Sequence, residues 1–161
     1  MTAAYRAVAG RIRQDLDDVA QLAERAEAAW KRYEATGDDH YLDSVALNLH
    51  DVYVGCERLF EDIARRVDES VPDGPHGHQE LLDQMSSDIP STRPPVLSPG
   101  TRRQMERYQG FRHVVRNVYA AEFDADQIEP LIRRLPAVCK AVTTELGVFA
   151  DTLEQIAMDE S

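Results

Sequence analysis

Residues 5–33 read YRAVAGRIRQDLDDVAQLAERAEAAWKRY, and their apolar side chains recur at steps of three or four residues. This spacing places the apolar side chains on one side of an α-helix, with acids and arginines on the other. The stripe consists of Tyr5, Val8, Ile12, Leu16, Val19, Leu22, Ala26, Trp30 and Tyr33. We expect an amphipathic helix of about 30 residues that ends near Gly37, because glycine readily adopts the left-handed conformation that terminates helices.

Four further helices are expected after this one. Asp38 or Asp39 can cap a second helix, whose apolar stripe continues to Val67 before the Pro/Gly-rich stretch 71–75. A short helix over about residues 78–87 is followed by an ordered, proline-rich loop. Serine and proline at 98–99 form a typical start for a helix that runs to about residue 121. The last helix follows a cap at residue 124, and its prolines at 130 and 136 should kink it or split off its first turns.

These elements predict an all-α fold, an antiparallel bundle of four long helices plus one short helix, with residues 1–161 forming a single helical domain. No apolar run approaches the roughly 20 residues that a membrane span needs. The first residues lack the apolar block of a secretory signal. Cys56 and Cys139 lie far apart in apolar helical patterns, as is typical of buried thiols. We therefore expect a cytoplasmic protein without a membrane partner.

The charge of the chain is unevenly distributed. The net charge is −11, which argues against a protein that coats DNA or RNA along its whole surface. Residues 98–120, however, contain five arginines and one acid and carry +4, which leaves −15 for the remainder. Such arginines are either solvated, or paired with acids of a neighbouring helix, or part of a phosphate-binding surface. Gly110, within this helix, suggests that a neighbouring element packs closely there.

Residues 108–119, YQGFRHVVRNVY, contain the strongest candidates for chemistry. On a helix Arg112, Arg116 and Tyr119 share one face, and His113 and Asn117 share the adjacent face. Histidine transfers protons near neutral pH, and arginine stabilises the charge that builds on a reacting phosphate, so neither a metal nor a cofactor is expected.

The other histidines, by contrast, fit roles outside catalysis. Two of them, at 76 and 78, are interpreted as loop surface residues, although a metal could use them, and those at 40 and 50 are interpreted as structural.

The same segment resembles the HEPN superfamily and, within it, the HepT-like ribonuclease toxins. The superfamily is marked by Arg-x4-6-His and the HepT branch by Arg-x4-His-x-Tyr, a frame that Arg112, Asn117 and Tyr119 occupy in this chain. The flanking strings GHQELLDQM (77–85), RPPVLS (93–98) and FRHVVR (111–116) are similar as well. The resemblance extends from about residue 47 to residue 153.

This resemblance implies a homodimer in which the motif helices of two protomers form one RNA-binding cleft. It implies metal-independent endoribonuclease activity, with Arg112 stabilising the reacting phosphate. Among the arginines of the basic helix, we expect Arg112, Arg116 and Arg107 to contact RNA. Asn117 occupies the position of the catalytic histidine, and asparagine cannot exchange a proton near pH 7, so His113, on the same helix face, is the candidate substitute.

The resemblance also implies a partner for the chain. HepT-type toxins are commonly paired with a nucleotidyltransferase-type antitoxin, which adds AMP to the tyrosine of the motif, here Tyr119. Bulk and negative charge at that position would block an incoming RNA phosphate.

Two other functions stay open beside the ribonuclease toxin of a toxin–antitoxin pair. One is a catalytically inactive HEPN-type helical module that binds RNA, a nucleotide or a nucleotidyltransferase partner. The other is a helical bundle without any role on nucleic acid, which predicts that the arginines of residues 98–120 pair with acids of neighbouring helices. Asn117 favours the inactive module, whereas Arg112, Tyr119 and the basic helix favour the toxin.

Overall fold

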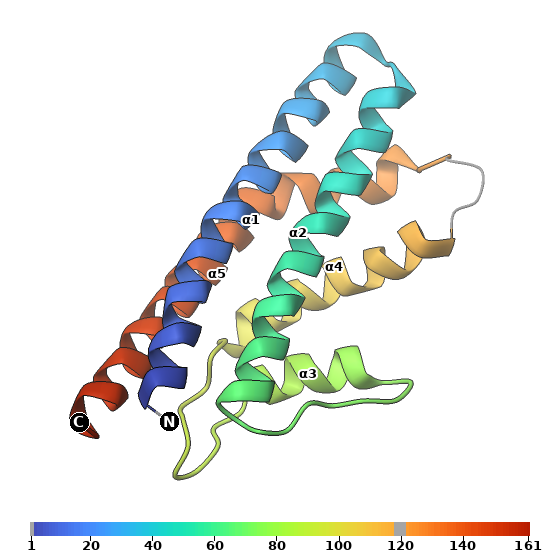
Figure 1. The fold of residues 1–161 in the computed structure, drawn as a ribbon. Helices are drawn as coiled ribbons and strands as arrows, with labels where there is room; N and C mark the ends of the chain where they lie inside the picture. The colour runs from blue at the N-terminus through green and yellow to red at the C-terminus, as the bar shows by residue number, and fades with distance from the viewer. Residues whose placement is uncertain (1, 118–121) are drawn as a thin grey trace.

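A computed structural model of the chain describes residues 2–117 and 122–161. Five helices make up the fold in the order α1 (Thr2–Thr36), α2 (Asp39–Arg66), α3 (Gly77–Met85), α4 (Pro99–Asn117) and α5 (Ala125–Asp159) (Figure 1). No strand occurs within these two ranges, where the only ladder pairing is an isolated bridge between Ile89 and Arg93. The all-α class, with four long helices and one short one, is therefore confirmed.

The first two helices form an antiparallel hairpin whose turn follows from its sequence. Gly37 adopts a φ of 66°, and its N–H donates to the Tyr33 carbonyl at 2.8 Å, which closes the end of α1. Asp38 then caps α2, since its side chain accepts a hydrogen bond from the His40 N–H at 3.0 Å. The expected short connection is thus confirmed.

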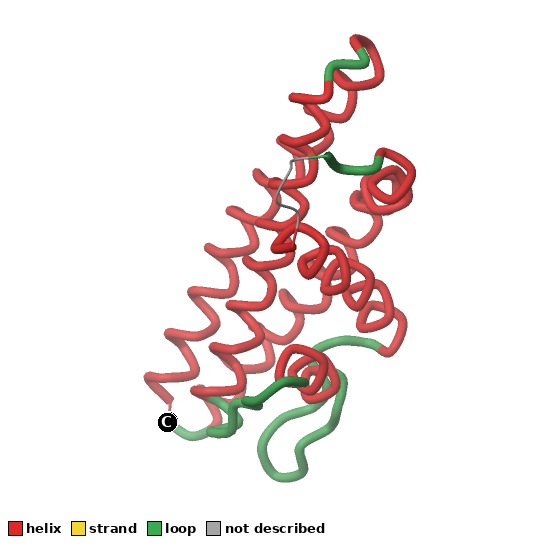
Figure 2. The backbone as a smooth tube through the Cα atoms, turned by 90° about the vertical axis from the view of Figure 1, so that its right-hand side faces the viewer, coloured by secondary structure: helices red, strands yellow, loops and turns green. Residues whose placement is uncertain are grey.

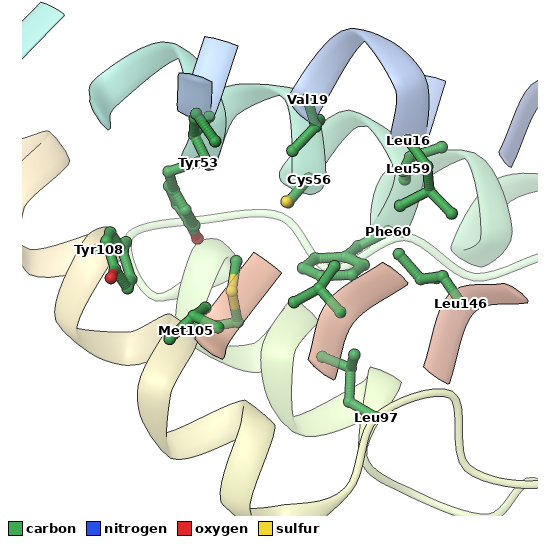
Figure 3. Close-up of a cluster of buried hydrophobic side chains, with 14 of the residues drawn as sticks. Leu16, Val19, Tyr53, Cys56, Leu59, Phe60, Leu97, Met105, Tyr108 and Leu146 are labelled. Carbon is green, nitrogen blue, oxygen red and sulfur yellow. The ribbon is translucent and has the colours of Figure 1, made fainter. Parts of the chain in front are cut away.

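The hydrophobic core lies where α1 packs along α2 and α5, and where α4 covers the other side of α2 (Figure 1). Figure 3 shows side chains of α1, α2, α4 and α5 converging on this core, with Leu97 added from the loop before α4. Its largest fully buried members include Tyr53, Phe60 and Leu146. The stripe predicted for residues 5–33 is buried along most of its length, so the periodic pattern correctly identified the inner face.

The loop between α3 and α4 is held in place by Arg93, whose side chain is fully buried. Its guanidinium forms two hydrogen bonds of 2.7 Å to Asp68 and also donates to the carbonyls of Gln84, Ser87 and Pro94. Figure 2 shows that the loops flanking α3 gather at the end of the molecule where the C-terminus lies. The loop is therefore ordered, as the sequence predicted.

Of two expectations about backbone geometry, one is confirmed and the other is wrong. Pro130 and Pro136 lie inside α5, which is one continuous helix, and Figure 1 shows its first turns set at an angle to the rest, so the predicted kink is confirmed. Gly110 does not mark close packing, since it is exposed and a β-carbon there would meet no atom within 4 Å. No helix among the described residues is both long and apolar enough to cross a membrane.

Candidate functional site between α2, α3 and α4

Three polar side chains from three helices meet beside the N-terminus of α3. Nδ1 of His78 lies 2.8 Å from Oε2 of Glu57 on α2, and Nε2 of His78 lies 3.1 Å from Nη1 of Arg112 on α4. Nη2 of Arg112 is 4.0 Å from the other carboxylate oxygen of Glu57. We call this group the Glu57–His78–Arg112 cluster.

The spacing of polar residues on α2 creates one wall of this site. His50, Tyr53 and Glu57 are separated by three and four residues, which places them on one face of the helix. That face turns toward α3 and α4, because Glu57 contacts His78 and Arg112. Glu57 is only 6% exposed, so its negative charge must be balanced inside the protein. Arg112, whose side chain is 18% exposed, supplies the opposite charge.

Hydrogen-bonding chemistry fixes the protonation pattern of the cluster. A carboxylate only accepts hydrogen bonds and a guanidinium only donates them. Nδ1 of His78 must therefore donate to Glu57, and Nε2 must accept from Arg112. His78 is thus a neutral imidazole whose lone pair on Nε2 faces Arg112. Since 42% of its side chain remains exposed, the imidazole lies at the border between the buried carboxylate and solvent.

Burial and nearby charges shift the pKa values of two side chains beside the cluster, Tyr53 and His50. Burial raises the pKa of Tyr53 far above its usual range, and the adjacent Glu57 carboxylate adds to this effect while Arg112 opposes it. Burial also lowers the pKa of His50, and Arg112 and Arg116 lower it further. Both side chains are therefore neutral near pH 7. The charges at the site come from Glu57 and the two arginines of α4.

The motif residues at the end of α4 lie beside this cluster rather than in it. Arg116, His113 and Asn117 are exposed. The Asn117 amide donates to the carbonyl of His113 one turn earlier, at 2.8 Å, so it caps its own helix backbone. Tyr119, the predicted acceptor of AMP, lies outside the described residues. The structure thus brings Arg112, but neither Asn117 nor His113, into contact with Glu57.

Arg107, the third predicted RNA contact, lies on another side of α4. It lines a surface pocket with Arg134 of α5, and five residues of helix rotate it by roughly 140° away from Arg112. Arg107 and Arg112 therefore belong to different surfaces. If both contact RNA, they contact different parts of it.

The arginines of α4 also differ in their ion pairs. Arg102 bonds to Asp83 of α3 and lies 3.0 Å from Glu106 of its own helix. Arg112 approaches Glu57, as the reading without a nucleic-acid role predicts. Arg103, Arg107 and Arg116 form no ion pair among residues 2–117 and 122–161, and all three are exposed. Part of the basic helix is neutralised by neighbours, and part keeps its charge in solvent.

Sequence reasoning missed the two partners of Arg112. His78 was expected to be an ordinary loop residue, but it is bound on both ring nitrogens, so that expectation is wrong. Glu57 directly follows the buried Cys56 and lies within the apolar pattern of α2, where a charged residue is unusual. That position was the available signal for a buried partner. It did not indicate which cation would balance the charge.

The fold and the site together define an all-α helical module with one Glu–His–Arg cluster between its second, third and fourth helices. A family model described as HepT-like protein matches residues 44–153, which include α3, α4, most of α2 and α5, and every member of the cluster. The chain belongs to this HepT-like family of the HEPN superfamily, as the resemblance predicted. No curated protein and no solved structure matches the chain.

Proposed function

We propose that this chain is the RNA-cleaving toxin of a toxin–antitoxin pair and that it cuts RNA without a metal ion, next to Arg112. The supporting observation is the position of Arg112: the arginine at the family's motif position lies against a neutral imidazole at the protein surface. Arginine stabilises the charge that develops on a phosphate in the transition state. An imidazole beside it is suited to move a proton of the adjacent ribose.

RNA reaches the cluster along the exposed part of α4 in this proposal. Arg116 lies one turn beyond Arg112 and carries its charge into solvent, so it can hold a neighbouring phosphate. Binding of this kind weakens with salt, because each neutralised phosphate releases counterions. The exposed end of α4 is also where a second protomer would dock, as in the homodimer that the resemblance implies, and two such helices would concentrate positive potential in one cleft.

The direct test uses the purified protein and end-labelled single-stranded RNA of mixed sequence, in buffer containing EDTA. We expect cleavage products that end in a 2′,3′-cyclic phosphate, and loss of cleavage in Arg112→Ala and Arg112→Lys, since lysine lacks the planar set of donors. Arg103→Ala is the matched control, because Arg103 is exposed on the same helix without contacting the cluster. A wild-type protein that neither binds nor cuts RNA overturns the proposal.

An antitoxin of the nucleotidyltransferase type is the proposed partner of the chain. Such a partner would add AMP to Tyr119, three residues after Arg116 in the sequence, and the added phosphate would compete with RNA for Arg116. Co-expression with a nucleotidyltransferase-type antitoxin should increase the intact mass by one AMP group. Tyr119→Phe should prevent this increase. An unchanged mass in the wild type contradicts this partner.

One observation favours a second function, a module that binds RNA without cutting it. Asn117 occupies the motif's histidine position and uses its amide on its own helix. In that case RNA would bind with the same dependence on Arg116 and on salt, but no product would form. The cleavage assay distinguishes the two functions directly.

A further inference from the structure

The position that normally carries the catalytic histidine of this motif contains Asn117, whose amide group neither takes up nor releases a proton near neutral pH. Its side chain is exposed and donates to the carbonyl of His113. Cleavage of RNA by its own 2′-hydroxyl needs a group that removes the proton of that hydroxyl. If the chain cuts RNA, this group must come from elsewhere in the structure.

His78 has the geometry of such a base. Its Nδ1–H is held by the buried carboxylate of Glu57 at 2.8 Å, which fixes both the ring orientation and the tautomer. The lone pair on Nε2 then accepts a hydrogen bond from the guanidinium of Arg112, 3.1 Å away. A base that is oriented by a carboxylate on its far nitrogen recurs in many hydrolytic enzymes.

We propose that His78, brought to the motif arginine by α3, replaces the missing histidine as the proton acceptor of the site, with Glu57 as its positioning residue. This inference rests on the proposed function. It assigns the proton transfer to a residue 39 positions before Asn117 in the sequence, on a different helix.

In this proposal Arg112 changes its hydrogen-bond partner when RNA binds. In the structure its Nη1 donates to His78, while its Nε is buried without a hydrogen-bond partner among the described residues. The guanidinium therefore uses only part of its five N–H donors. A phosphodiester that binds at the exposed edge takes over the Nη1 donor. This exchange releases Nε2 of His78 next to the ribose of the same nucleotide.

Cleavage then proceeds by attack of the ribose 2′-oxygen on the adjacent phosphorus. The 2′-hydroxyl gives its proton to Nε2 of His78, and the 2′-oxygen forms a bond to phosphorus. The bond from phosphorus to the 5′-oxygen breaks, which leaves a 2′,3′-cyclic phosphate on one fragment. The departing 5′-oxygen takes a proton from a water molecule. The imidazolium of His78 returns its proton to the hydroxide so formed, which restores the neutral base.

The groups that surround His78 are consistent with this cycle. Glu57 of α2 stabilises the imidazolium, whereas Arg112 of α4 opposes it until the phosphate has neutralised the guanidinium. Tyr53 and His50, on the same face of α2, are neutral near pH 7, because burial raises the pKa of the first and lowers that of the second. Arg116 of α4 adds positive charge at the exposed end.

The test compares single-turnover cleavage of the end-labelled mixed-sequence RNA by wild type, His78→Gln and His78→Ala across a pH series. We expect both variants to cut at least about a hundredfold more slowly, which is the usual contribution of a general base. RNA binding, measured by fluorescence anisotropy with the non-cleavable DNA–RNA chimera of the same sequence, should change less than about threefold. The rate of the wild type should fall at acid pH, and this fall should be absent from the residual rate of His78→Gln.

Two further variants separate catalysis from structure. His76→Gln is the matched control, because His76 is exposed two residues earlier and its side chain forms no capping hydrogen bond; it should cut at the wild-type rate. Added imidazole should restore cleavage to His78→Ala, which a folding defect would not allow. Glu57→Gln should lower kcat more than it weakens RNA binding.

The outcomes distinguish this inference from the proposed function. If the wild type cuts RNA and His78→Gln cuts equally well, the assignment of His78 is wrong while the ribonuclease stands. If cleavage is lost in His113→Gln instead, the base lies on α4 and the assignment is again overturned. If the wild type binds or ignores RNA without ever cutting it, the proposed ribonuclease and the inference built on it both fall.

Discussion

Arg93 and Asp68 form a buried two-point ion pair that fastens the loop after α3 to the end of α2. Nε and Nη2 of the arginine each lie 2.7 Å from a different carboxylate oxygen, and both side chains are almost completely buried. The planar fork of arginine matches both oxygens of a carboxylate, which makes such pairs specific as well as strong. This contact holds α3, and with it His78, next to α2.

Removing the arginine should therefore strongly destabilise the fold. Arg93→Ala leaves the Asp68 charge buried without its partner, so we expect the free energy of unfolding to fall by about 3–5 kcal/mol. Urea denaturation followed by circular dichroism measures this change. Arg103→Ala, an exposed arginine of α4, serves as control and should stay within about 0.5 kcal/mol of wild type. A small loss in Arg93→Ala would show that the loop is not anchored by this pair.

Two glycines inside helices should respond to alanine in different ways. A β-carbon at Gly10 of α1 meets no atom within 4 Å, so Gly10→Ala should raise the free energy of unfolding by about 0.5–1 kcal/mol. At Gly55 of α2 the new β-carbon would lie 2.9 Å from Cγ2 of the buried Val19. This steric overlap should cancel the stabilisation that alanine gives at Gly10. Gly55→Ala should therefore unfold at a lower urea concentration than Gly10→Ala. Equal stabilisation by both changes would contradict this packing.

Stability should decrease at mildly acid pH partly because of His50. Burial lowers the pKa of His50 in the folded protein below its ordinary value of 6.5. The unfolded chain then binds the proton more readily, so the contribution of this residue is present above about pH 6.5 and is lost as the pH falls toward the folded-state pKa. Thermal melts of wild type and His50→Gln measure the effect. The variant should lose less stability over this range, and parallel curves would refute the assignment.

Both cysteine thiols should be unreactive in the folded protein. Burial raises the pKa of Cys56 to about 12 and that of Cys139 to about 11, so almost no thiolate exists at mildly alkaline pH. Since the thiolate is the reactive form, Ellman's reagent should label neither thiol quickly in native buffer and both thiols in denaturant. The variants Cys139→Ser and Cys56→Ser would show which thiol is responsible for any fast phase of labelling. Rapid labelling of Cys56 would mean that the core opens frequently around it.

Restoring the motif histidine should increase cleavage. Asn117→His places a titrating imidazole one turn beyond His113, where it can protonate the departing 5′-oxygen in place of water. We expect the cleavage rate to rise at least about tenfold over wild type under identical conditions. Asn117→Gln controls for the longer side chain and should leave the rate unchanged or lower. A slower Asn117→His variant would argue that the asparagine amide itself positions the RNA.

The helices could be predicted from the sequence because apolar periodicity, capping residues and prolines act locally. The spacing from Tyr5 to Tyr33, the turn at Gly37 and the start at Pro99 all correspond to elements of the structure. Gly110 was misinterpreted because a glycine pattern cannot tell an open surface from a close contact. The kink in α5 could be predicted as well, because a proline inside a helix acts on the backbone of its own turn.

The candidate site could be predicted only in part. Arg112 was singled out because arginines and a motif spacing concentrate on one segment. His78 was not singled out, because its contacts depend on the tertiary fold. Glu57 lies 21 positions before it, across a Pro/Gly-rich loop, and Arg112 lies 34 positions after it. Such contacts depend on how the loop folds back. The contacts of Arg93 that hold the next loop, between α3 and α4, are tertiary as well.

In the proposed ribonuclease, the short helix α3 would provide a point of control that is separate from RNA binding. His78 sits in the first turn of a nine-residue helix, whereas the exposed Arg116 belongs to α4. A molecule that separated α3 from α2 would prevent proton transfer by His78, while RNA would remain bound at Arg116. The inhibited protein would then be found bound to uncut RNA and not free of RNA.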